Sequence, residues 1–427
     1  MLRLFTIYDL VFLIFMLAYL PLYLFRGKFH QGFSRRLGIL PANLNLDRPI
    51  WIHAVSVGEA ISIKALVLEL RKAYPHKKLV ISTVTTTGNK IAQGLLEPGD
   101  LLTYLPLDFS FIVNSVLKRI NPCLFIIAET EIWPNLIISL HKQKIPIVTV
   151  NGRISDSSYA GYRAIKLFIR PILNKIEQFC VQSGRDALRL QNLGVRKEKI
   201  HATGNVKFDM DLEDSAGLNA KIYRQKLWLG LEDKLLVCGS THAQEEELII
   251  KVYQELLPVF PKLKLLIAPR HPERSKNIAD IVSKNGFTPV FISSILQPIG
   301  PVCINSPIFI LDIIGTLLDF YSAADIVFVG GSLVKTGGHN ILEPAGLKKP
   351  VIFGPYMFNF RDITGLFLEN KAGIIVHNPA ELKRKIKELL ENSLLAKELG
   401  ERAYELIIKN SGATRKNIGI IKQLNLI

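Results

Sequence analysis

The chain has 427 residues, of which 48% are hydrophobic and 21% charged, so its composition is globular rather than disordered and its length allows two domains. Its 53 Lys and Arg against 37 Asp and Glu give a net charge of +16, which predicts an acidic partner without choosing among nucleic acid, anionic lipid and a phosphorylated substrate. The cysteines form no C-x-x-C pair, which argues against disulfides and zinc and indicates a reducing compartment; they are Cys123, Cys180, Cys238 and Cys303.

The amino terminus is strongly apolar. From Leu4 to Phe25 the only charged residue is Asp9, and a bilayer requires roughly 20 apolar residues. No small-residue cleavage site follows, so we predict a membrane anchor rather than a signal peptide, and the basic residues after it place the body of the protein on the cytoplasmic side. Asp9 and Pro21 interrupt the apolar run, so a helix that lies in the membrane interface is the alternative to a spanning one.

After this segment, short β-branched runs alternate with amphipathic helical patterns, which is typical of parallel sheets with crossover helices. The first predicted strands lie at residues 50–55, 79–85, 123–129, 145–150 and 179–183. A polar stretch at residues 204–217 then reads as a linker. A second series lies at residues 235–240, 263–270, 309–314, 325–331, 350–354 and 373–377, and the chain ends in helix without a further strand. The pattern predicts two Rossmann-like domains joined near residue 210.

Four charged residues of the first half follow strands or lie in the linker, and ligands of open α/β sheets bind beyond the carboxyl ends of strands. Glu59, in HAVSVGEA, is either a helix-dipole partner or a base that takes a proton from a hydroxyl. Glu129 and Glu131, in AETEIWPN, are either solvated capping acids or parts of a site, since two neighbouring acids are costly to desolvate. Lys207, in GNVKFD, is either an exposed linker lysine or the cation of that site.

The second half carries candidate anion-binding segments. VGGSLVKTGGHNILEPAG, Val329 to Gly346, has glycines that let backbone N–H groups approach a ligand, and a helix start that favours a phosphate; the alternative is an ordinary glycine-rich turn. Arg270, in IAPRHPER, can present a fixed fork to a phosphate or carboxylate. In CGSTHAQEEE we expect Ser240 or Thr241 to cap a helix. No histidine pair has H-x-x-x-H spacing, so we predict no metal site; the histidines considered are His53, His242, His271 and His339.

The helical run from Ser157 to Arg170 carries basic residues at i, i+3 and i+7 beside apolar ones. It is either an exposed basic face over a core-facing one or an attachment to an anionic membrane surface. The basic residues are Arg163, Lys166 and Arg170, and the apolar face is Tyr162, Ile165, Phe168 and Ile169.

Six motifs in one order resemble the Kdo (3-deoxy-D-manno-octulosonic acid) transferases, which act on the lipid A precursor of Gram-negative envelopes. They are HAVSVGE, AETEIWPN, the NGR of Asn151 to Arg153, GNVKFD, PRHPER and VGGSLVKTGGHNILEPA, and they cover nearly the whole chain. The resemblance implies an α/β protein of the GT-B glycosyltransferase class, with two Rossmann-like domains facing a cleft and an N-terminal membrane-anchor helix. The expected parts are an anchor at residues 1–27, an acceptor-binding domain at 28–206 and a CMP-Kdo-binding domain at 207–427.

The resemblance also implies an inverting transfer of Kdo from CMP-Kdo to lipid IVA in lipopolysaccharide biosynthesis. Glu59 matches the base that activates the acceptor hydroxyl, and Glu129 and Lys207 match positions that support the transition state. The partners implied are CMP-Kdo, the lipid A precursor and the cytoplasmic surface of the inner membrane, with no nucleic acid, no cofactor and no metal. The expected CMP-binding residues are Pro269, Arg270, Ile314, Gly315, Thr316, Asn340, Ile341, Leu342 and Glu343.

One segment departs from the family pattern, because DIIGTL, Asp312 to Leu317, has Thr316 where the family usually has an acidic residue. Donor binding is therefore expected to be weaker or rearranged. Two other functions fit the composition: a membrane-associated GT-B transferase that uses a UDP-sugar on a lipid acceptor, and a non-catalytic membrane protein that binds polyanions.

Overall fold

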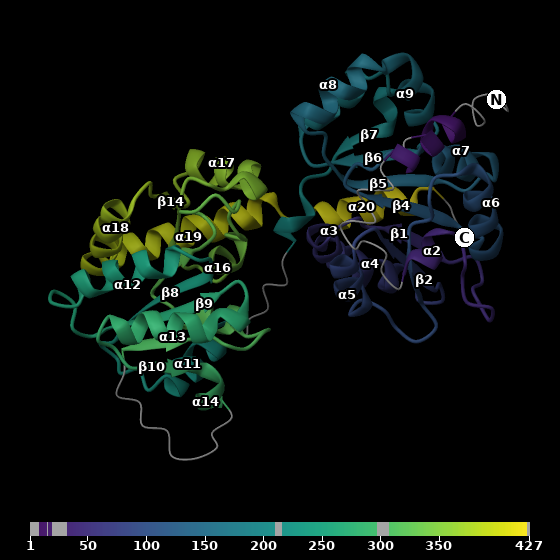
Figure 1. Cartoon of the computed structure of the whole chain (residues 1–427). Helices are drawn as coiled ribbons and strands as arrows, with labels where there is room; N and C mark the ends of the chain where they lie inside the picture. Colours follow the sequence, from purple (N-terminus) through teal and green to yellow (C-terminus); the bar gives the residue numbers. More distant parts are fainter. Residues whose placement is uncertain (1–7, 15, 19–31, 210–215, 297–306, 425–427) are drawn as a thin grey trace. The chain divides into compact units, whose positions relative to one another are not determined.

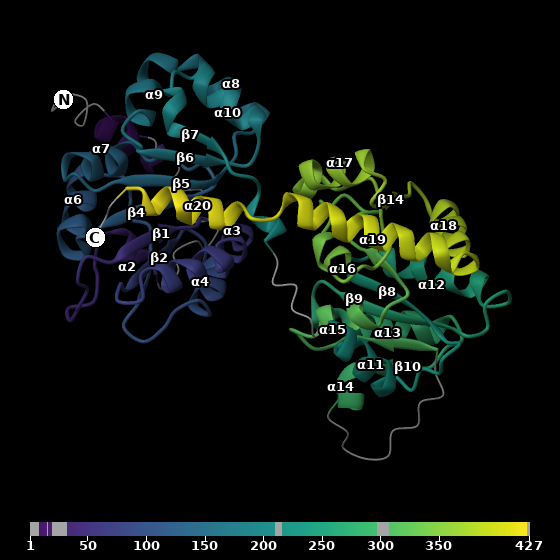
Figure 2. The ribbon, with the colours of Figure 1, turned by 180° about the vertical axis from the view of Figure 1, so that it is seen from behind.

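The protein divides into two compact units, each built on one parallel sheet (Figure 1 and Figure 2). Unit 1 is Met1–Asp209 together with Asn410–Ile427, and unit 2 is Met210–Lys409. The computed structural model describes residues 8–14, 16–18, 32–209, 216–296 and 307–424.

Unit 1 contains a seven-stranded parallel sheet in the order β3-β2-β1-β4-β5-β6-β7. Its strands are β1 Ile50–His53, β2 Leu79–Thr83, β3 Leu101–Tyr104, β4 Leu124–Ala128, β5 Ile147–Gly152, β6 Gln178–Val181 and β7 Ile200–Ala202. Its helices are α2 Phe33–Arg36, α3 Val57–Ser62, α4 Lys64–Ala73, α5 Thr86–Gln93, α6 Ser110–Ile120, α7 Pro134–Lys142, α8 Asp156–Ala164, α9 Lys166–Leu173, α10 Gly184–Asn192, η1 Lys197–Lys199, η2 Val206–Phe208 and α20 Ala413–Lys422.

Both faces of the unit 1 sheet are buried, as the almost continuous apolar runs of its central strands require. Successive residues of a strand point to opposite faces. On one face Trp51 meets Phe125 edge to face, with ring centroids 5.0 Å apart, among side chains of α6 and α7. On the other face Ile50 and Ile52 pack with residues of α4 and α20. The unit therefore has two cores, one on each side of the sheet.

Unit 2 contains a second seven-stranded parallel sheet, in the order β10-β11-β9-β8-β12-β13-β14, and α12, α13, α18 and α19 pack on one of its faces. Its strands are β8 Lys234–Thr241, β9 Leu263–Pro269, β10 Pro289–Phe291, β11 Ile308–Ile310, β12 Ile326–Val329, β13 Val351–Phe353 and β14 Ile374–Ile375. Its helices are α11 Ala216–Lys226, α12 Glu245–Leu256, η3 Pro272–Arg274, α13 Ser275–Lys284, α14 Ile292–Leu296, α15 Leu317–Ala323, α16 Leu342–Gly346, η4 Phe358–Phe360, α17 Arg361–Glu369, α18 Pro379–Glu391 and α19 Ser393–Asn410.

The carboxyl-terminal helix corrects the predicted domain boundaries. The sequence placed residues 207–427 in one domain, whereas α20 belongs to unit 1, where it packs against α4 and β5 (Figure 2). Asp209 fixes the start of α20, because its carboxylate accepts the backbone N–H groups of Gly412 and Thr414, both at 2.5 Å. α20 belongs to unit 1 because its apolar face packs beside α4 and completes the core there.

The predicted anchor lies largely outside the described residues. Of the segment from Leu4 to Phe25, residues 8–14 and 16–18 are described, and they are helical. Asp9 accepts hydrogen bonds from the Ser110 backbone N–H at 3.0 Å and from the Asn135 side-chain amide at 2.7 Å, so the one charge of this segment is bound to unit 1. Within the described ranges, no helix has the length and apolar character needed to cross a membrane.

Candidate active site

Each sheet has a point where the chain reverses its direction of growth, and ligands of open α/β sheets bind at the carboxyl ends of the strands there. In unit 1 this point lies between β1 and β4, and in unit 2 between β8 and β12. Glu59 follows β1 and Glu129 follows β4, whereas His242 follows β8 and Gly330 follows β12. Of the predicted site residues, Glu59, Glu129 and Asn340–Glu343 follow the strands at these points, whereas Arg270 follows β9, Ile314–Thr316 follow β11 and Lys207 follows β7.

Glu59 is buried in the first turn of α3. Its carboxylate accepts the Val55 backbone N–H at 2.7 Å and the Ser56 hydroxyl at 3.1 Å. Burial raises the pKa of Glu59 to about 7, and the charges of Glu129 and Glu131 add to the rise. The residue thus satisfies the helix start, as one reading expected, and its carboxyl group also exchanges a proton near neutral pH, as a base requires.

Glu129 adopts a backbone conformation that side chains rarely take, with φ at 59°. Its backbone N–H donates to the Val150 carbonyl at 2.8 Å, which holds this turn at the end of β4. Burial, followed by the charge of Glu129, also raises the pKa of Glu131. Strained residues of this kind concentrate at functional sites, so Glu129 stays a predicted site residue.

Lys207 does not lie on an exposed linker. It is part of η2 in unit 1, where its backbone N–H donates to the Asn205 side chain at 3.0 Å. Val206 beside it donates its N–H to the Asn151 side chain at 3.1 Å, and Asn151 is itself buried with φ at 54°. Asn151 is a positioning residue that sequence reasoning did not identify, although it begins the NGR motif.

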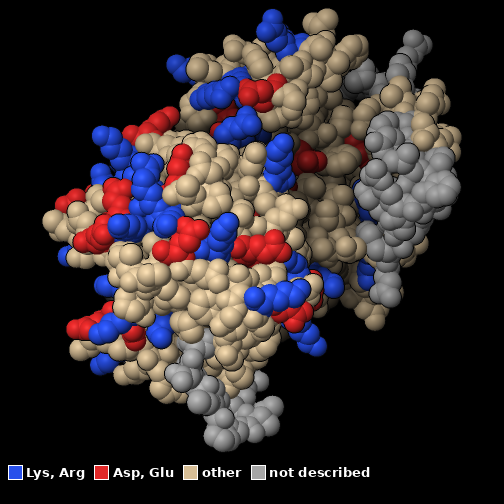
Figure 3. Space-filling model, turned by 60° about the vertical axis from the view of Figure 1, so that its left-hand side comes forward, with Lys and Arg blue, Asp and Glu red and all other residues tan. Residues whose placement is uncertain are grey.

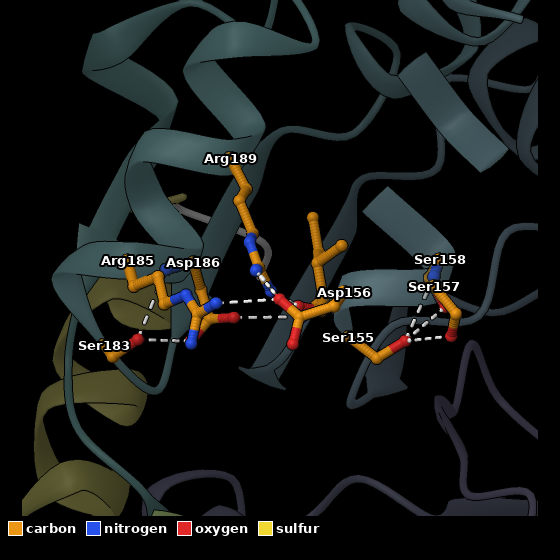
Figure 4. Close-up of polar contacts among 9 residues, drawn as sticks. Ser155, Asp156, Ser157, Ser158, Ser183, Arg185, Asp186 and Arg189 are labelled. Carbon is orange, nitrogen blue, oxygen red and sulfur yellow. Dashed lines mark hydrogen bonds and ion pairs between the residues drawn. The ribbon is translucent and has the colours of Figure 1, made fainter. Parts of the chain in front are cut away.

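The loop that follows β5 is fixed by polar contacts with α10 (Figure 4). Asp186 accepts the Ile154 backbone N–H at 2.9 Å. Asp156, at the start of α8, binds both Arg185, at 2.7 Å, and Arg189. These contacts hold the segment after the NGR motif and the beginning of the α8–α9 region in one arrangement.

In unit 2 a buried glutamate shapes the glycine-rich loop after β12. Glu245, the first residue of α12, accepts the backbone N–H groups of Gly331 at 2.6 Å, Ser332 at 2.9 Å and Leu333 at 2.8 Å. It also accepts the His242 N–H at 3.0 Å. Its four N–H donors come from the loops after β8 and β12, so one carboxylate joins the two strands of the reversal point.

The predicted cap of this helix was wrong. β8 continues through Thr241, and Gln244 precedes the first turn of α12, so neither Ser240 nor Thr241 caps it. The Thr241 hydroxyl instead donates to Glu246 at 3.1 Å, and Arg274 binds the same carboxylate at 2.7 Å. The strand is longer than predicted because it pairs with β9 as far as Pro269.

The packing and backbone conformation of the glycine-rich loop after β12 require its glycines. A Cβ atom on Gly330 would lie 2.7 Å from the Thr241 Cα, so the loop packs against the end of β8. Gly331, Gly337 and Gly338 have positive φ values of 65°, 104° and 70°, which other residues rarely adopt. This packing accounts for the glycines, and close approach of a nucleotide stays a prediction.

The imidazole rings of three histidines, His242, His271 and His339, lie close together in unit 2. The Nε2 atoms of His242 and His339 are 2.9 Å apart, so one must donate and the other accept, and His271 packs edge-on to His242. Burial, with the positive charge of Arg270 next, lowers the pKa of His339 to about 4. In the described part of the chain, no group of three or more His, Cys, Asp and Glu side chains is arranged to hold a metal ion.

The predicted nucleotide-contacting residues of unit 2 are partly brought together. Pro269 ends β9, and Arg270, which follows it, is exposed and acts electrostatically on both His339 and Glu343. Burial raises the pKa of Glu343, although the Asn340 amide donates to its carboxyl at 3.1 Å. The side chains of the next two predicted residues are buried in the core, which leaves only their backbone for a ligand; they are Ile341 and Leu342.

The segment from Asp312 to Leu317, in which the sequence departs from the family pattern, has both exposed and buried groups. Ile314 is 86% exposed, and Gly315 has a φ of 98°. The Thr316 hydroxyl is buried, and no described residue hydrogen-bonds to it. Asp312 is bound elsewhere, since it accepts the Ser293 backbone N–H at 2.9 Å. The position of Thr316 therefore has an unused polar group.

Residues 31–210 match the family model described as 3-deoxy-D-manno-octulosonic-acid transferase (kdotransferase). A 3-deoxy-D-manno-octulosonic acid transferase of Haemophilus influenzae is 35% identical over 92% of this chain and 92% of its own length. One of the same name from Chlamydophila psittaci is 33% identical over 86% of this chain and 84% of its own. A solved glycosyltransferase of Rickettsia africae has a TM-score of 0.55 and 16% identity, covering 88% of this chain and 98% of its own, which confirms the predicted pair of parallel-sheet α/β domains, a fold like that of GT-B glycosyltransferases.

Proposed function

The chain belongs to the Kdo transferase family, and from this premise we propose that it transfers Kdo from CMP-Kdo to lipid IVA with inversion at the anomeric carbon, Glu59 serving as the base. The observation that carries the proposal is the buried Glu59 carboxyl at the reversal point of unit 1, with a pKa of about 7. A base with such a pKa combines a sizeable ionised fraction at neutral pH with real proton affinity.

In the proposed reaction the Glu59 carboxylate takes the proton of the acceptor hydroxyl. The hydroxyl oxygen bonds to the anomeric carbon of Kdo as the bond from that carbon to the CMP phosphate oxygen breaks, and CMP leaves with that electron pair. The proton ends on Glu59. Glu129 and Lys207 are proposed to support the charge that develops. Glu129 has a strained backbone and acts electrostatically on Glu59, and the short helix that carries Lys207 is fixed by the hydrogen bond from Val206 to Asn151.

Donor binding is assigned to unit 2. The exposed Arg270 guanidinium offers a bidentate partner to the CMP phosphate, and the backbone around Gly315 and at Asn340–Glu343 offers N–H groups. A charged phosphate leaving group held in this way needs no metal to depart, so none is proposed.

Attachment to the cytoplasmic face of the inner membrane is part of the proposal, because the acceptor is a lipid. The apolar amino terminus and the net charge of +16 support it. Side chains of the described helical residues 8–14 and 16–18 also expose apolar groups, including Leu10, Ile14 and Leu17. An interfacial position of this helix agrees with the contacts of Asp9.

The decisive experiment is transfer from CMP-Kdo to a tetraacylated lipid A precursor in detergent, followed by mass spectrometry. Wild type and the control Glu69→Gln, a half-buried carboxylate paired with Lys72 in the same unit, should add Kdo, and Glu59→Gln should not. Full activity of Glu59→Gln would reject the base. Thermal stabilisation by UDP but not CMP, without Kdo transfer, would favour the UDP-sugar alternative.

A further inference from the structure

A cavity of about 230 Å³ lies in unit 2 at the edge of the sheet opposite to the predicted donor residues. Lys234 begins β8, Asp325 directly precedes β12, and Lys349 lies just before β13, so the cavity opens at the amino ends of these strands. Arg270 and Gly330 follow the carboxyl ends of β9 and β12. The cavity is therefore separate from the segments to which donor binding is assigned, and it has no part in the proposed reaction.

Positive charge dominates its lining. The wall contains four lysines, Lys234, Lys348, Lys349 and Lys397, and one acidic residue, Asp325; we call it the lysine cavity. On the face of the molecule seen in Figure 3, Lys and Arg side chains lie among Asp and Glu side chains. The lining of the cavity, with four lysines and one aspartate, is therefore richer in positive charge than a mixed surface of this kind.

The single carboxylate of the cavity is already engaged. Asp325 accepts the Arg224 guanidinium at 3.0 Å, the Leu235 backbone N–H at 2.8 Å and the Lys234 ammonium at 3.5 Å. Two cations and an amide share one negative charge, so Asp325 leaves an excess of positive charge in the wall. It does not repel an incoming anion as a free carboxylate would.

Lys349 makes no ion pair of its own among the described residues. It is partly buried and burial lowers the pKa of its ammonium; the charge of Asp325 offsets part of this effect, but Asp325 is already paired with Arg224 and Lys234. Removing an ammonium from water with only a shared counter-charge is unfavourable, and a bound anion would offset that cost. Lys349 is thus the residue of the cavity that gains most from an anion.

The other walls complete an anion site. Ser393, which starts the 18-residue helix α19, lines the cavity, so the positive end of a helix dipole faces it. Lys348 is held over the Tyr404 ring at 4.8 Å, and Lys397 lies 4.0 Å from Glu401, so both ammonium groups are positioned by α19. The remaining wall is apolar and gives depth to the hollow; it includes Ile326, Leu389 and Ala396.

We propose that the lysine cavity binds a phosphate group, carried either by a soluble phosphate ester or by a lipid headgroup. A phosphate offers two charges and three acceptor oxygens to several ammonium groups and a helix start, whereas a carboxylate offers fewer of both. The volume is below the roughly 300–1,000 Å³ of pockets for drug-sized ligands, so the occupant is a phosphate with a small or external substituent.

The test measures binding of inorganic phosphate to the full chain by calorimetry. Wild type should bind, Lys349→Met should bind at least tenfold more weakly, and the control Lys284→Met, which removes an exposed lysine of the same unit, should bind as wild type does. Lys397→Met changes an exposed side chain and should also weaken binding, which guards against a folding defect in Lys349→Met.

Two further probes distinguish the sources. If glycerol 3-phosphate binds in a Lys349-dependent way while phosphatidate vesicles bind Lys349→Met and wild type equally, the ligand is soluble. If phosphatidate vesicles, but not phosphatidylcholine vesicles, lose binding with Lys349→Met and glycerol 3-phosphate does not bind, it is a headgroup. Equal phosphate binding by Lys349→Met and Lys284→Met would overturn the proposal. Because no step of Kdo transfer enters this test, loss of one proposal leaves the other intact.

Discussion

The burial of Glu59 determines the pH range in which its carboxyl group can act as a base. Burial raises the pKa of Glu59 to about 7, and a base works only in its ionised form. We therefore predict that kcat/KM for Kdo transfer is low in weakly acidic solution, rises with pH through about 7 and then levels off. The measurement is kcat/KM across this range for wild type and for Glu69→Gln, whose profiles should coincide. A rate that is flat through neutrality in wild type would contradict the role of Glu59.

Thr316 offers a second test at the scale of one residue. Its hydroxyl is buried without a hydrogen-bond partner among the described residues, and the family usually has an acid at this place. We predict that Thr316→Glu lowers the KM for CMP-Kdo by about three- to tenfold, the value of roughly one added hydrogen bond to the nucleotide. Thr316→Val is the matched control and should leave KM unchanged. Reduced activity of Thr316→Glu without tighter donor binding would show that the threonine is adapted to this chain.

At the scale of elements, the end of β8 and the loop after β12 are joined through the first residue of α12. Glu245→Ala would leave the N–H groups of Gly331, Ser332 and Leu333 without their buried acceptor. We predict a loss of about 3 kcal/mol or more in the free energy of unfolding, with a raised KM for CMP-Kdo. Urea unfolding and donor kinetics measure the two effects.

The exposed neighbour Glu247 supplies the control for Glu245, because it lies on the same helix turn. Glu247→Ala should change neither stability nor KM. Glu245→Gln keeps one acceptor oxygen and should fall between wild type and Glu245→Ala in stability while still raising KM. A normal KM in a destabilised Glu245→Gln protein would limit Glu245 to a structural role.

The α8–α9 region differs from its predicted pattern. The apolar face expected to enter the core is divided: Ile169 is buried, whereas Phe168 is 70% exposed and its neighbour Leu167 is 88% exposed. Arg163 and Lys166 are exposed beside them. Exposed large apolar groups next to basic ones are typical of a helix that enters the headgroup region of an anionic membrane.

We predict that the double substitution Leu167→Ser with Phe168→Ser lowers binding of the protein to anionic vesicles by at least tenfold, because about two buried apolar side chains are lost from the lipid interface. The measurement is vesicle sedimentation at fixed salt. Leu188→Ser on α10, which removes another exposed apolar side chain, should bind as wild type does. If both variants lost vesicle binding equally, membrane contact would depend on exposed apolar side chains in general and not on those of α9.

The elements that the sequence did not predict have a common physical feature. β3, β7 and β10 are all edge strands, and all are short. An edge strand pairs on one side only, so fewer of its residues need be apolar and its pattern is weak. Strands in the middle of each sheet are buried on both faces and were predicted from their continuous apolar runs.

The candidate site also contains some residues that local sequence could predict and others that it could not. Glu129 directly follows a central strand and Glu59 lies in the first helical turn after another, so their place at the carboxyl end of the sheet was predictable from local sequence. The contact between His242 and His339 joins residues 97 positions apart, and Glu245 meets residues 86 to 88 positions away. A run of three glutamates opening a helix predicts only a favourable dipole contact, since nothing local distinguishes the one that is buried.

For the whole molecule, the sequence order of the chain does not coincide with its compact units. The helical pattern of the carboxyl terminus predicts α20, but an amphipathic period does not say which core its apolar face enters. The answer depends on Asp209, which binds the first backbone N–H groups of α20 after the chain has passed through unit 2. The core of unit 1 therefore contains residues from both sides of unit 2 in the sequence.

This arrangement predicts where a substitution near the carboxyl terminus acts. Ile421 is fully buried in the unit 1 core beside α4, so Ile421→Ala should cost about 2–4 kcal/mol in the free energy of unfolding through the cavity it leaves. The loss should fall on unit 1 alone, because Ile421 packs with Ile418 and the inner strands of that sheet. Amide hydrogen exchange should therefore accelerate in β1 and β4 and stay unchanged in β8 and β12. Leu394→Ala, at an exposed site of α19, should alter neither set. Faster exchange in β8 and β12 would instead mean that the two units unfold as one, so that α20 transmits its stability to the whole chain.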